Sequence, residues 1–534
     1  MSDAPIEGPP KPHHPNVARA GGIMMASLLL SRILGLVREI VMAKMFGAGD
    51  AVDAFTLAFM VPDFLFFAIA GGALSSAFIP VFSEYLHTKR EREAWHIFSS
   101  VASIMSAVVL TFIVLAWIFA EPFTRLLSGG IDEQLVPLIV EMTKILLPAQ
   151  FAFFIGGLMF GTLYARQAFA IPGLGPNVYN LGFIFGAIVL GGFFKLGIVG
   201  MAWGALGGAL IGNLIIPIYV MRGLGSPFKI SFDTKHPGVR KVFVLMAPVV
   251  LGLSLPGVYD MITRYFGSFY HEGVNSWLKY GNVLMQAPLG VFGQSLAIAV
   301  FPALAQFYAQ ERMDMYRSQL SSTIRTVLYL TLPVCALFVV GAEPVVAAIY
   351  QAGEFNHQDV LAVASILRIL ALGIWAWCLH PVLMRGFFAV QTTILPIVLG
   401  TTTTALFVIL ILVLRPALGY HALPTASSIS AVLLVIAMMV AVQTKVGTLD
   451  VKGILTTGGK SLLASLVFAM VTYGILLSPI GRIEGRGKLL AVLLLFLISV
   501  PGAWIYYFIT KAMGMPETGT ISRAMERVSK KFRR

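Results

Sequence analysis

The chain has 534 residues, of which 57% are hydrophobic and only 12% are charged, and its mean hydropathy is +0.85. Soluble domains carry about 25% charged residues, so this composition excludes an ordinary soluble protein and predicts a membrane protein. The formal net charge of +13 would also be compatible with a protein that binds nucleic acid. The basic residues, however, lie mainly in loops between apolar runs, which is typical of membrane topology.

Residues 1–16 are polar, rich in proline and histidine, and lack the pattern of a signal peptide, so we expect a retained cytoplasmic tail. Apolar runs of membrane-spanning length follow, and they predict an all-α polytopic membrane protein with about fourteen transmembrane helices. The predicted spans are residues 18–46, 52–86, 94–120, 134–167, 172–194, 197–221, 240–270, 275–308, 314–341, 357–390, 394–414, 421–445, 459–480 and 487–511.

Two pairs of segments repeat at nearly the same distance along the chain. GGALSSAFIPVFSEY (residues 71–85) resembles GQSLAIAVFPALAQFY (residues 293–308), and Pro80 aligns with Pro302. GTLYARQAFAIP (residues 161–172) resembles RGFFAVQTTILP (residues 385–396), and Pro172 aligns with Pro396. Both distances equal six predicted helices, an even number, so the two halves have the same orientation. Parallel repeats are typical of transporters whose substrate site lies between the halves near the bilayer midplane.

The repeat predicts an N-lobe at residues 17–222 (helices 1–6) and a C-lobe at residues 240–446 (helices 7–12), joined by a cytoplasmic linker at residues 223–239. Helices 13 and 14, at residues 447–512, lie outside the repeat, and residues 513–534 form a basic cytoplasmic tail.

Basic residues concentrate in the even-numbered loops, whereas a cluster at Arg482, Arg486 and Lys488 in the last odd-numbered loop is an exception. By the positive-inside rule, both termini are predicted to be cytoplasmic. The even-loop residues are Lys89, Arg90, Arg92, Arg222, Lys229, Lys235, Arg240, Lys241, Arg312, Arg317, Lys445 and Lys452.

The first predicted helix carries charges at bilayer depth, where each costs a few kcal/mol. Arg38 and Glu39 are adjacent, and Arg32 lies seven residues before Glu39, on the same helix face. One interpretation is that the arginines line a water-filled cavity and bind an anionic cargo, since a guanidinium makes bidentate hydrogen bonds with phosphate. The alternative is that Arg38 and Glu39 pair with other helices and only fix packing. Asp53 could likewise simply cap the second helix.

No H-E-x-x-H or G-x-S-x-G motif is present, so the sequence gives little support to an enzyme. A membrane glycosyl- or acyltransferase would need a paired-acid or histidine-centred site, for which His271–Glu272 and His357–Asp359 are weak candidates. Cys335 and Cys378 lie in apolar spans and are predicted to be buried free thiols.

Several strings resemble the MurJ (MviN) lipid II flippases of the multidrug/oligosaccharidyl-lipid/polysaccharide exporter superfamily, over about Val17 to Lys445. The resemblance implies fourteen helices, two six-helix lobes around a V-shaped cavity, and a groove for a lipid tail near helices 13 and 14. It also implies movement of an undecaprenyl-pyrophosphate-linked sugar–peptide, lipid II, from the inner to the outer leaflet by alternating access. The strings are SRILGLVRE, FGAGDAVDAF, VPDFLFFAIAGGALSSAFIPVFSEY and SWLKYGNVLMQAPLGVFGQSLAIAVFPAL.

The resemblance also implies roles for single residues. Arg32 and Arg38 match the family's first-helix arginines, and Glu39 stands where the family has an acid. Asp53 matches the aspartate after the glycine break, and Ser276 matches the serine that opens the eighth helix.

The chain departs from the family pattern at several polar positions. Phe66 and Val283 stand where members have arginines, Thr263 stands at an Asp/Asn position implicated in cation binding, and Thr401–Thr404 replace polar ligands. We therefore consider local substitutes, although Lys279 could instead reach the membrane interface and Asp260 could simply pair with Arg264. The predicted substrate-binding set is Arg32, Arg38, Glu39, Asp53, Arg264, Ser276, Lys279 and Asn282.

The sequence thus predicts a lipid II flippase, not an enzyme, in the bacterial inner membrane. The alternative transporter is an exporter of another polyprenyl-linked oligosaccharide of the O-antigen type. We expect no cofactor or bound metal, with coupling to the membrane potential or a monovalent cation as a candidate. Expected partners are lipid II, membrane lipids and the cell-wall synthesis machinery, with a monomeric chain and no nucleic acid.

Overall fold

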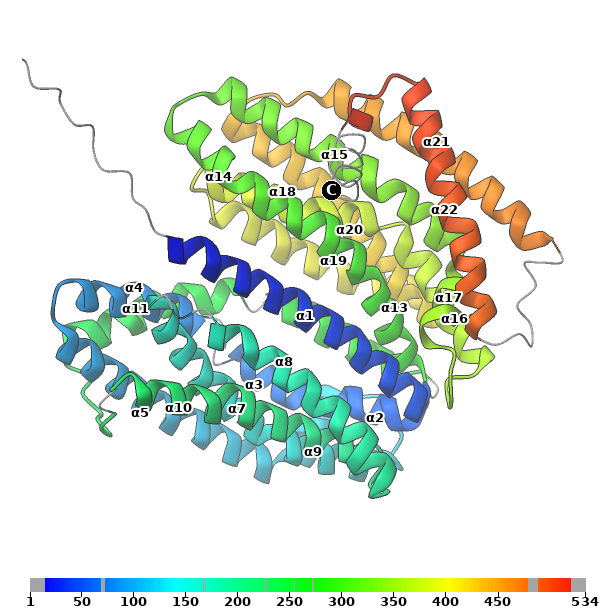
Figure 1. Ribbon diagram of the computed structural model, residues 1–534. Coiled ribbons are helices and arrows are strands. Elements are labelled where there is room, and N and C mark those ends of the chain that lie inside the picture. The colour runs from blue at the N-terminus through cyan, green and yellow to red at the C-terminus, as the bar shows by residue number, and fades with distance from the viewer. Residues whose placement is uncertain are drawn as a thin grey trace, which may run out of the picture. The chain divides into compact units, whose positions relative to one another are not determined.

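The computed structural model describes residues 15–519, except 69–72, 167, 169, 226–227, 254, 271–272 and 479–487. Its described residues are helical, apart from loops and one isolated bridge between Ala352 and Phe355 (Figure 1). This confirms the all-α prediction. The chain divides into two compact units. Unit 1 comprises residues 1–41, 58–126 and 136–254, and unit 2 comprises residues 42–57, 127–135 and 255–534.

Unit 1 is built around α7, which packs against α4, α5 and α9. Its linker runs along α5 after α10 and leads into α11. The helices are α1 (Pro15–Phe46, up to residue 41), α3 (Met60–Ala68), α4 (Ala73–His87), α5 (Glu91–Ile118), α6 (Ala120–Leu127), α7 (Val136–Ala165), α8 (Ala170–Phe185), η1 (Gly186–Phe193), α9 (Gly197–Ala209), η2 (Leu210–Ile215), α10 (Ile216–Gly223) and α11 (Pro237–Leu253).

Helix α8 and the first residue of η1 approach α9 through glycines spaced four residues apart. A Cβ on Gly182 would lie 2.5 Å from the Gly204 carbonyl oxygen, and one on Gly186 would lie 2.6 Å from the Gly200 carbonyl oxygen. Small residues of this spacing let two membrane helices bring their backbones into contact. The glycines therefore fix α8 in unit 1, and α8 carries two of the polar side chains described below.

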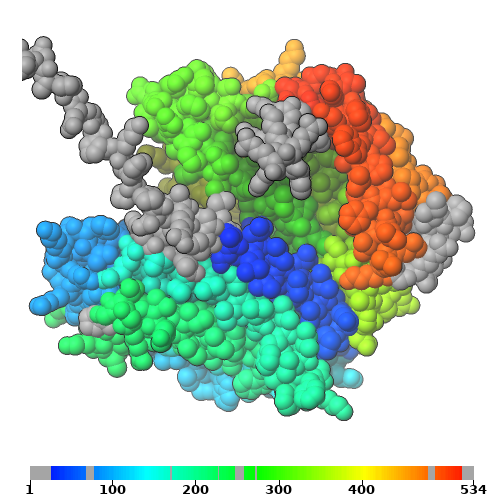
Figure 2. All heavy atoms as spheres, viewed as in Figure 1, coloured from blue at the N-terminus to red at the C-terminus, as the bar shows by residue number. Residues whose placement is uncertain are grey.

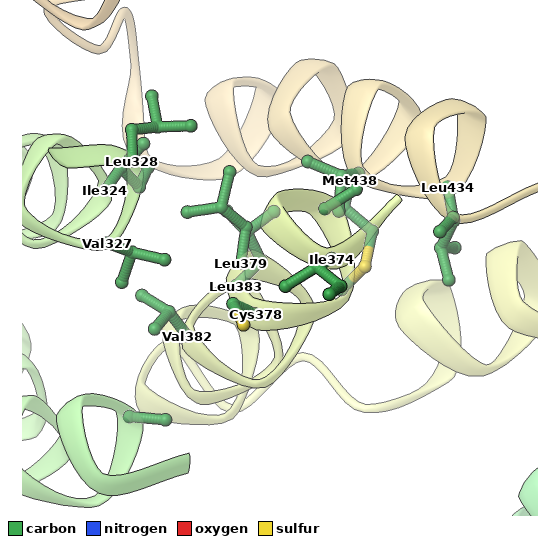
Figure 3. Close-up of a cluster of buried hydrophobic side chains, with 14 of the residues drawn as sticks. Ile324, Val327, Leu328, Ile374, Cys378, Leu379, Val382, Leu383, Leu434 and Met438 are labelled. Atoms are coloured by element: carbon green, nitrogen blue, oxygen red, sulfur yellow. The ribbon is translucent and has the colours of Figure 1, made fainter. Parts of the chain in front are cut away.

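Unit 2 contains the remaining helices, and its core lies among α15, α18 and α20 (Figure 3). Cys378 is part of this core, and both it and Cys335 are buried free thiols, as predicted. The helices are α2 (Asp50–Ala58), α12 (Leu255–Gly267), α13 (Val274–Pro288), η3 (Leu289–Gln294), α14 (Ser295–Ala309), α15 (Met313–Val340), α16 (Ala342–Tyr350), α17 (His357–Ala371), α18 (Ile374–Ala389), α19 (Ile394–Leu418), η4 (Gly419–His421), α20 (Ala422–Val446), α21 (Val451–Leu477) and α22 (Lys488–Ala512).

The local backbone geometry confirms the internal repeat. Helix α5 spans 28 residues from Glu91, and α15 spans 28 residues from Met313, in the register that aligns Pro80 with Pro302. Lys89 and Glu311 lie two residues before the starts of α5 and α15, and their φ angles are positive, 61° and 57° respectively. The amide that follows each of them donates to the carbonyl five residues earlier, from Arg90 to Tyr85 and from Arg312 to Phe307.

Nine helical stretches of the described residues are long and apolar enough to cross a membrane, or ten if the bent pair α17–α18 forms one span. One of these stretches, residues 394–446, contains both α19 and α20, which have 25 residues each. A multi-pass membrane protein is thus confirmed, whereas the count of fourteen stays a prediction.

Helices α21 and α22 follow the repeated part of the chain. Helix α21 packs along α15, and α22 packs against α16 and α21. Their outer faces expose large apolar side chains, including Leu455, Met470 and Phe496, and Figure 2 shows the surface of α22 in orange-red. A contiguous apolar face is the surface expected of a helix that contacts lipid.

Candidate functional site

Arg38 is held in place by its neighbour on α1 and by α8, all within unit 1. Its Nε and Nη2 atoms donate to Glu39 Oε1 at 3.1 and 2.6 Å, and Nη1 donates to Asn180 Oδ1 at 3.2 Å. Its guanidinium also stacks over the ring of Phe183, 4.7 Å from the centroid. The Glu39 side chain is only 3% exposed, whereas that of Arg38 is 26% exposed. The acid therefore orients the arginine, and the arginine presents its charge at the surface.

Two asparagines of α8, Asn177 and Asn180, complete this site, and neither was among the predicted site residues. Asn180 Nδ2 donates to the Ser31 carbonyl at 3.2 Å, and Asn177 Nδ2 donates to Ser27 Oγ at 2.9 Å. Both asparagines are buried, so their amides need partners. The sequence pattern that could have indicated them is a pair of asparagines three residues apart, on one face of an apolar span.

Asp53 and Ser276, which were predicted separately as site residues, contact each other in unit 2. Asp53 Oδ1 accepts hydrogen bonds from the backbone amide of Ser276 at 2.6 Å and from its hydroxyl, and Oδ2 accepts from the Gly273 amide at 2.8 Å. The carboxylate therefore caps the N-terminus of α13 rather than that of its own helix. Gly273, the N-cap residue, has φ +86°, a conformation that favours glycine.

Lys279 lies on α13, one turn after Ser276. Its ammonium group lies near two other side chains of unit 2. The Nζ atom is 3.3 Å from Met42 Sδ and 5.7 Å from the centroid of the Phe55 ring. The side chain is half-buried. Val283, four residues on, is half-buried as well, as is Asn282.

Asp260 and Arg264 form an ion pair one turn apart on α12, as the packing alternative predicted. Arg264 Nη1 also lies 3.5 Å from the Thr56 carbonyl oxygen. Here the exposure is reversed relative to α1: the Asp260 side chain is 45% exposed and the Arg264 side chain only 19%. The pair thus presents its carboxylate more than its guanidinium.

The family described as lipid II flippase MurJ matches residues 42–480 of the chain. This protein belongs to the MurJ family. A probable lipid II flippase MurJ of Buchnera aphidicola subsp. Acyrthosiphon pisum is 30% identical over 373 residues, covering 69% of this chain and 72% of the relative. The lipid II flippase MurJ of Burkholderia cenocepacia is 26% identical over 391 residues, covering 72% and 75%.

Solved structures show the same fold. A lipid II flippase MurJ in an inward closed conformation matches with a TM-score of 0.74 and 24% identity, over 91% of this chain and 98% of that one. An inward-facing MATE family transporter of the MOP superfamily matches with a TM-score of 0.65 and 16% identity, over 78% and 94%.

At Phe66, Thr263 and Thr401–Thr404, where the resemblance implies other polar residues, the side chains have local partners. Phe66 packs against Phe154, with ring centroids 5.6 Å apart. The hydroxyls of Thr401–Thr404 donate to carbonyls four residues earlier in their own helix, at 2.8–3.0 Å, and the Thr263 hydroxyl does the same with Tyr259. Such internal bonds satisfy hydroxyls without a bound ligand. Arg32, in contrast, has an exposed side chain on α1.

Of the two candidates for a transferase site, His357–Asp359 lies among the described residues, and its carboxylate has a structural role. Asp359 accepts from the Asn356 amide at 3.0 Å in a capping box at the start of α17, and it accepts from Trp277 Nε1 at 3.2 Å. The carboxylate is therefore committed to holding α17 and α13. The other candidate, His271–Glu272, lies outside the described residues.

Proposed function

We propose that this protein translocates lipid II from the inner to the outer leaflet of the bacterial inner membrane by alternating access. The match of the MurJ family to residues 42–480 is the observation that carries this proposal. The relatives named above are described as lipid II flippases or probable lipid II flippases. The repeated transporter fold supports it as well, because parallel repeats are typical of proteins that expose one site to each side in turn.

Arg38 is the residue that we propose to bind the diphosphate of the cargo. Its guanidinium is 26% exposed while Glu39 and Asn180 fix its position, so little side-chain entropy remains to be lost on binding. A planar guanidinium can make two parallel hydrogen bonds to a phosphate group. Arg32, which lies exposed on the same helix, is proposed as an auxiliary cation, and Lys279 as a cation supplied by unit 2.

Both termini are proposed to be cytoplasmic, on the distribution of basic residues. Single cysteines test this in a Cys335→Ala, Cys378→Ala background. Thr88→Cys should react with a membrane-impermeant thiol reagent only from the cytoplasmic side, and Gln134→Cys only from outside, because both positions are exposed loop residues. Reaction of Gln134→Cys from the cytoplasm would contradict the proposed orientation.

The direct test of the cargo is rescue of a bacterial strain depleted of its own lipid II flippase. The protein should restore growth and cell shape, and an empty vector should not. If it inserts into the membrane but fails to restore growth, the cargo proposal is wrong. Restoration of surface O-antigen in a strain lacking its own O-antigen exporter would then support the other polyprenyl-linked cargo.

A further inference from the structure

A polar cavity of about 310 Å³ lies in unit 2 at the start of α15, beside the connection between α20 and α21. Nothing in the proposed transport of lipid II uses it. Its lining contains two arginines and several hydroxyl groups. The lining residues are Arg317, Ser318, Ser321, Arg325, Thr448, Leu449 and Asp450.

The two arginines of the cavity have different partners. Arg325 Nη1 donates to Asp450 Oδ2 at 2.8 Å, and its Nε lies 3.5 Å from Glu517 Oε1, so two carboxylates offset its charge. Asp450 also accepts from the Gly453 amide, which commits it to the start of α21. Arg317 Nη1 instead donates to the Val446 carbonyl at 3.3 Å, a neutral partner that uses one of five N–H donors. Arg317 thus brings a positive charge to the cavity wall.

The repeat shows what occupies the corresponding place in unit 1. In the register that aligns the start of α15 with the start of α5, Ser321 corresponds to Ser99 of α5. Ser99 Oγ accepts from the Lys229 amide at 3.2 Å, and Ser321 Oγ accepts from the Asp450 amide at 3.2 Å. In both units, therefore, the connection after the sixth helix of the repeat docks on the same serine of the third.

After the contact with that serine, the connecting segment takes a different course in the two units. In unit 1 the linker continues along α5, and Asp233 Oδ2 lies 3.0 Å from His96 Nε2. The hydrogen bond from His96 is the main cause that lowers the pKa of the Asp233 carboxyl. His96 corresponds to Ser318 of the cavity. In unit 2 the chain enters α21 at Val451, and the carboxylate in the lining, that of Asp450, is bonded to Arg325 and to the Gly453 amide rather than to Ser318.

We propose that this cavity is a binding site for a phosphate group, held by Arg317 with Ser318 and Thr448, in the place that a carboxylate fills in unit 1. Guanidinium and hydroxyl groups are donors suited to phosphate oxygens. A Cβ on Gly447 would lie 2.6 Å from Arg317 Nη1, so glycine at this position leaves room for the arginine head.

The surroundings favour a phospholipid headgroup as the source of that phosphate. The cavity lies where α15 and α21 begin and α20 ends, and basic pockets at such helix ends bind anionic headgroups. On α21, Val451 and Leu455 are 39% and 70% exposed, which offers an apolar surface to acyl chains. Free phosphate shares the headgroup chemistry and is the other source to be tested.

Native mass spectrometry of the delipidated full-length protein tests the proposal, independently of transport. The parent should bind one phosphatidylglycerol more tightly than phosphatidylcholine. Arg317→Gln should weaken that binding by about tenfold or more, since a lost charge-assisted hydrogen bond has this effect. Arg312→Gln is the matched control, because it removes the same charge from the start of the same helix, outside the lining, and should change binding by less than about twofold.

Thr448→Asp gives a second readout that does not truncate an arginine. The position is exposed, so the variant should fold, and the added carboxylate should expel phosphatidylglycerol. Displacement of phosphatidylglycerol by millimolar inorganic phosphate would show that the site binds the phosphate group alone. Resistance to displacement would show that the site also binds the rest of the lipid. Parent-like lipid binding by Arg317→Gln and Thr448→Asp, or an equal loss in Arg312→Gln, would overturn the proposal.

Discussion

Helices α1 and α12 carry opposite charges at equivalent positions. In the register of the internal repeat, Arg38 corresponds to Asp260, and the ends of the two helices, at Phe46 and Gly267, agree with this alignment within one residue. Each charge has an opposite partner nearby on its own helix. In α1 the more exposed member of the pair is the cation, whereas in α12 the more exposed member is the anion.

This difference shows how a repeated fold acquires an asymmetric site. The backbone repeats, as the matching loops before α5 and α15 demonstrate, but the charge that the pair presents is reversed. An anionic cargo would therefore be attracted by the Arg38 pair and not by the Asp260 pair. In unit 2, Lys279 is a cation whose Nζ atom lies near Met42 of α1 and Phe55 of α2.

The largest expected effect is that of removing Arg38. Arg38→Ala should abolish rescue of the flippase-depleted strain while the protein still inserts, because losing one side of a charged contact costs about 2–5 kcal/mol. Arg38→Lys should rescue in part, since an ammonium lacks the planar fork. Asp260→Ala, the control at the equivalent position, should retain more activity. Normal growth of the Arg38→Ala strain would assign Arg38 to packing alone.

Lys279→Ala should reduce transport several-fold, which growth at limiting expression would report. Adding Val283→Arg should restore part of the activity, because Val283 lies on the same face of α13, about 6 Å further along the helix. Val283→Arg alone serves as the control for the added bulk. Parent-like transport by Lys279→Ala at low and high cargo concentrations would show that this lysine supplies no needed charge.

Arg264 and Asp260 should behave as a structural pair. Arg264→Ala leaves the Asp260 carboxylate without its partner, at a cost of about 1 kcal/mol because that side chain is 45% exposed and solvent screens it. Arg264→Leu combined with Asp260→Leu should be less harmful than Arg264→Leu alone, as a double-mutant cycle with both single variants on unfolding temperature and transport would measure. A double variant that loses all transport would instead give the pair a direct role in it.

Asn180→Ala should have the smallest effect on transport, a few-fold loss. The substitution removes one hydrogen bond of about 1 kcal/mol that positions Arg38, but it keeps the charge. Asn177→Ala is the matched control, because Asn177 bonds to Ser27 on the same helix and does not bond to Arg38. Equal losses in the two variants would show that the asparagines act on the α1–α8 packing and not on Arg38.

The sequence was sufficient for the helical fold and the repeat, because hydrophobic length and self-similarity are local properties of the chain. It also located Arg38 and Glu39, since charges in an apolar span are conspicuous. It could not identify Asn180, because the face that α8 turns toward α1 depends on the glycine contacts of α8 with α9. Nor could it show that Asp53 caps α13, a contact between residues more than two hundred positions apart.

Binding of lipid II to the purified protein tests most directly whether Arg38 holds the cargo. Affinity should be measured for the parent, for Arg38→Ala and for the double variant Arg264→Leu, Asp260→Leu, at one salt concentration. We expect Arg38→Ala to weaken binding by more than about tenfold and the double variant by no more than about threefold. Equal affinities for the parent and Arg38→Ala, or a larger loss in the double variant, would contradict this assignment.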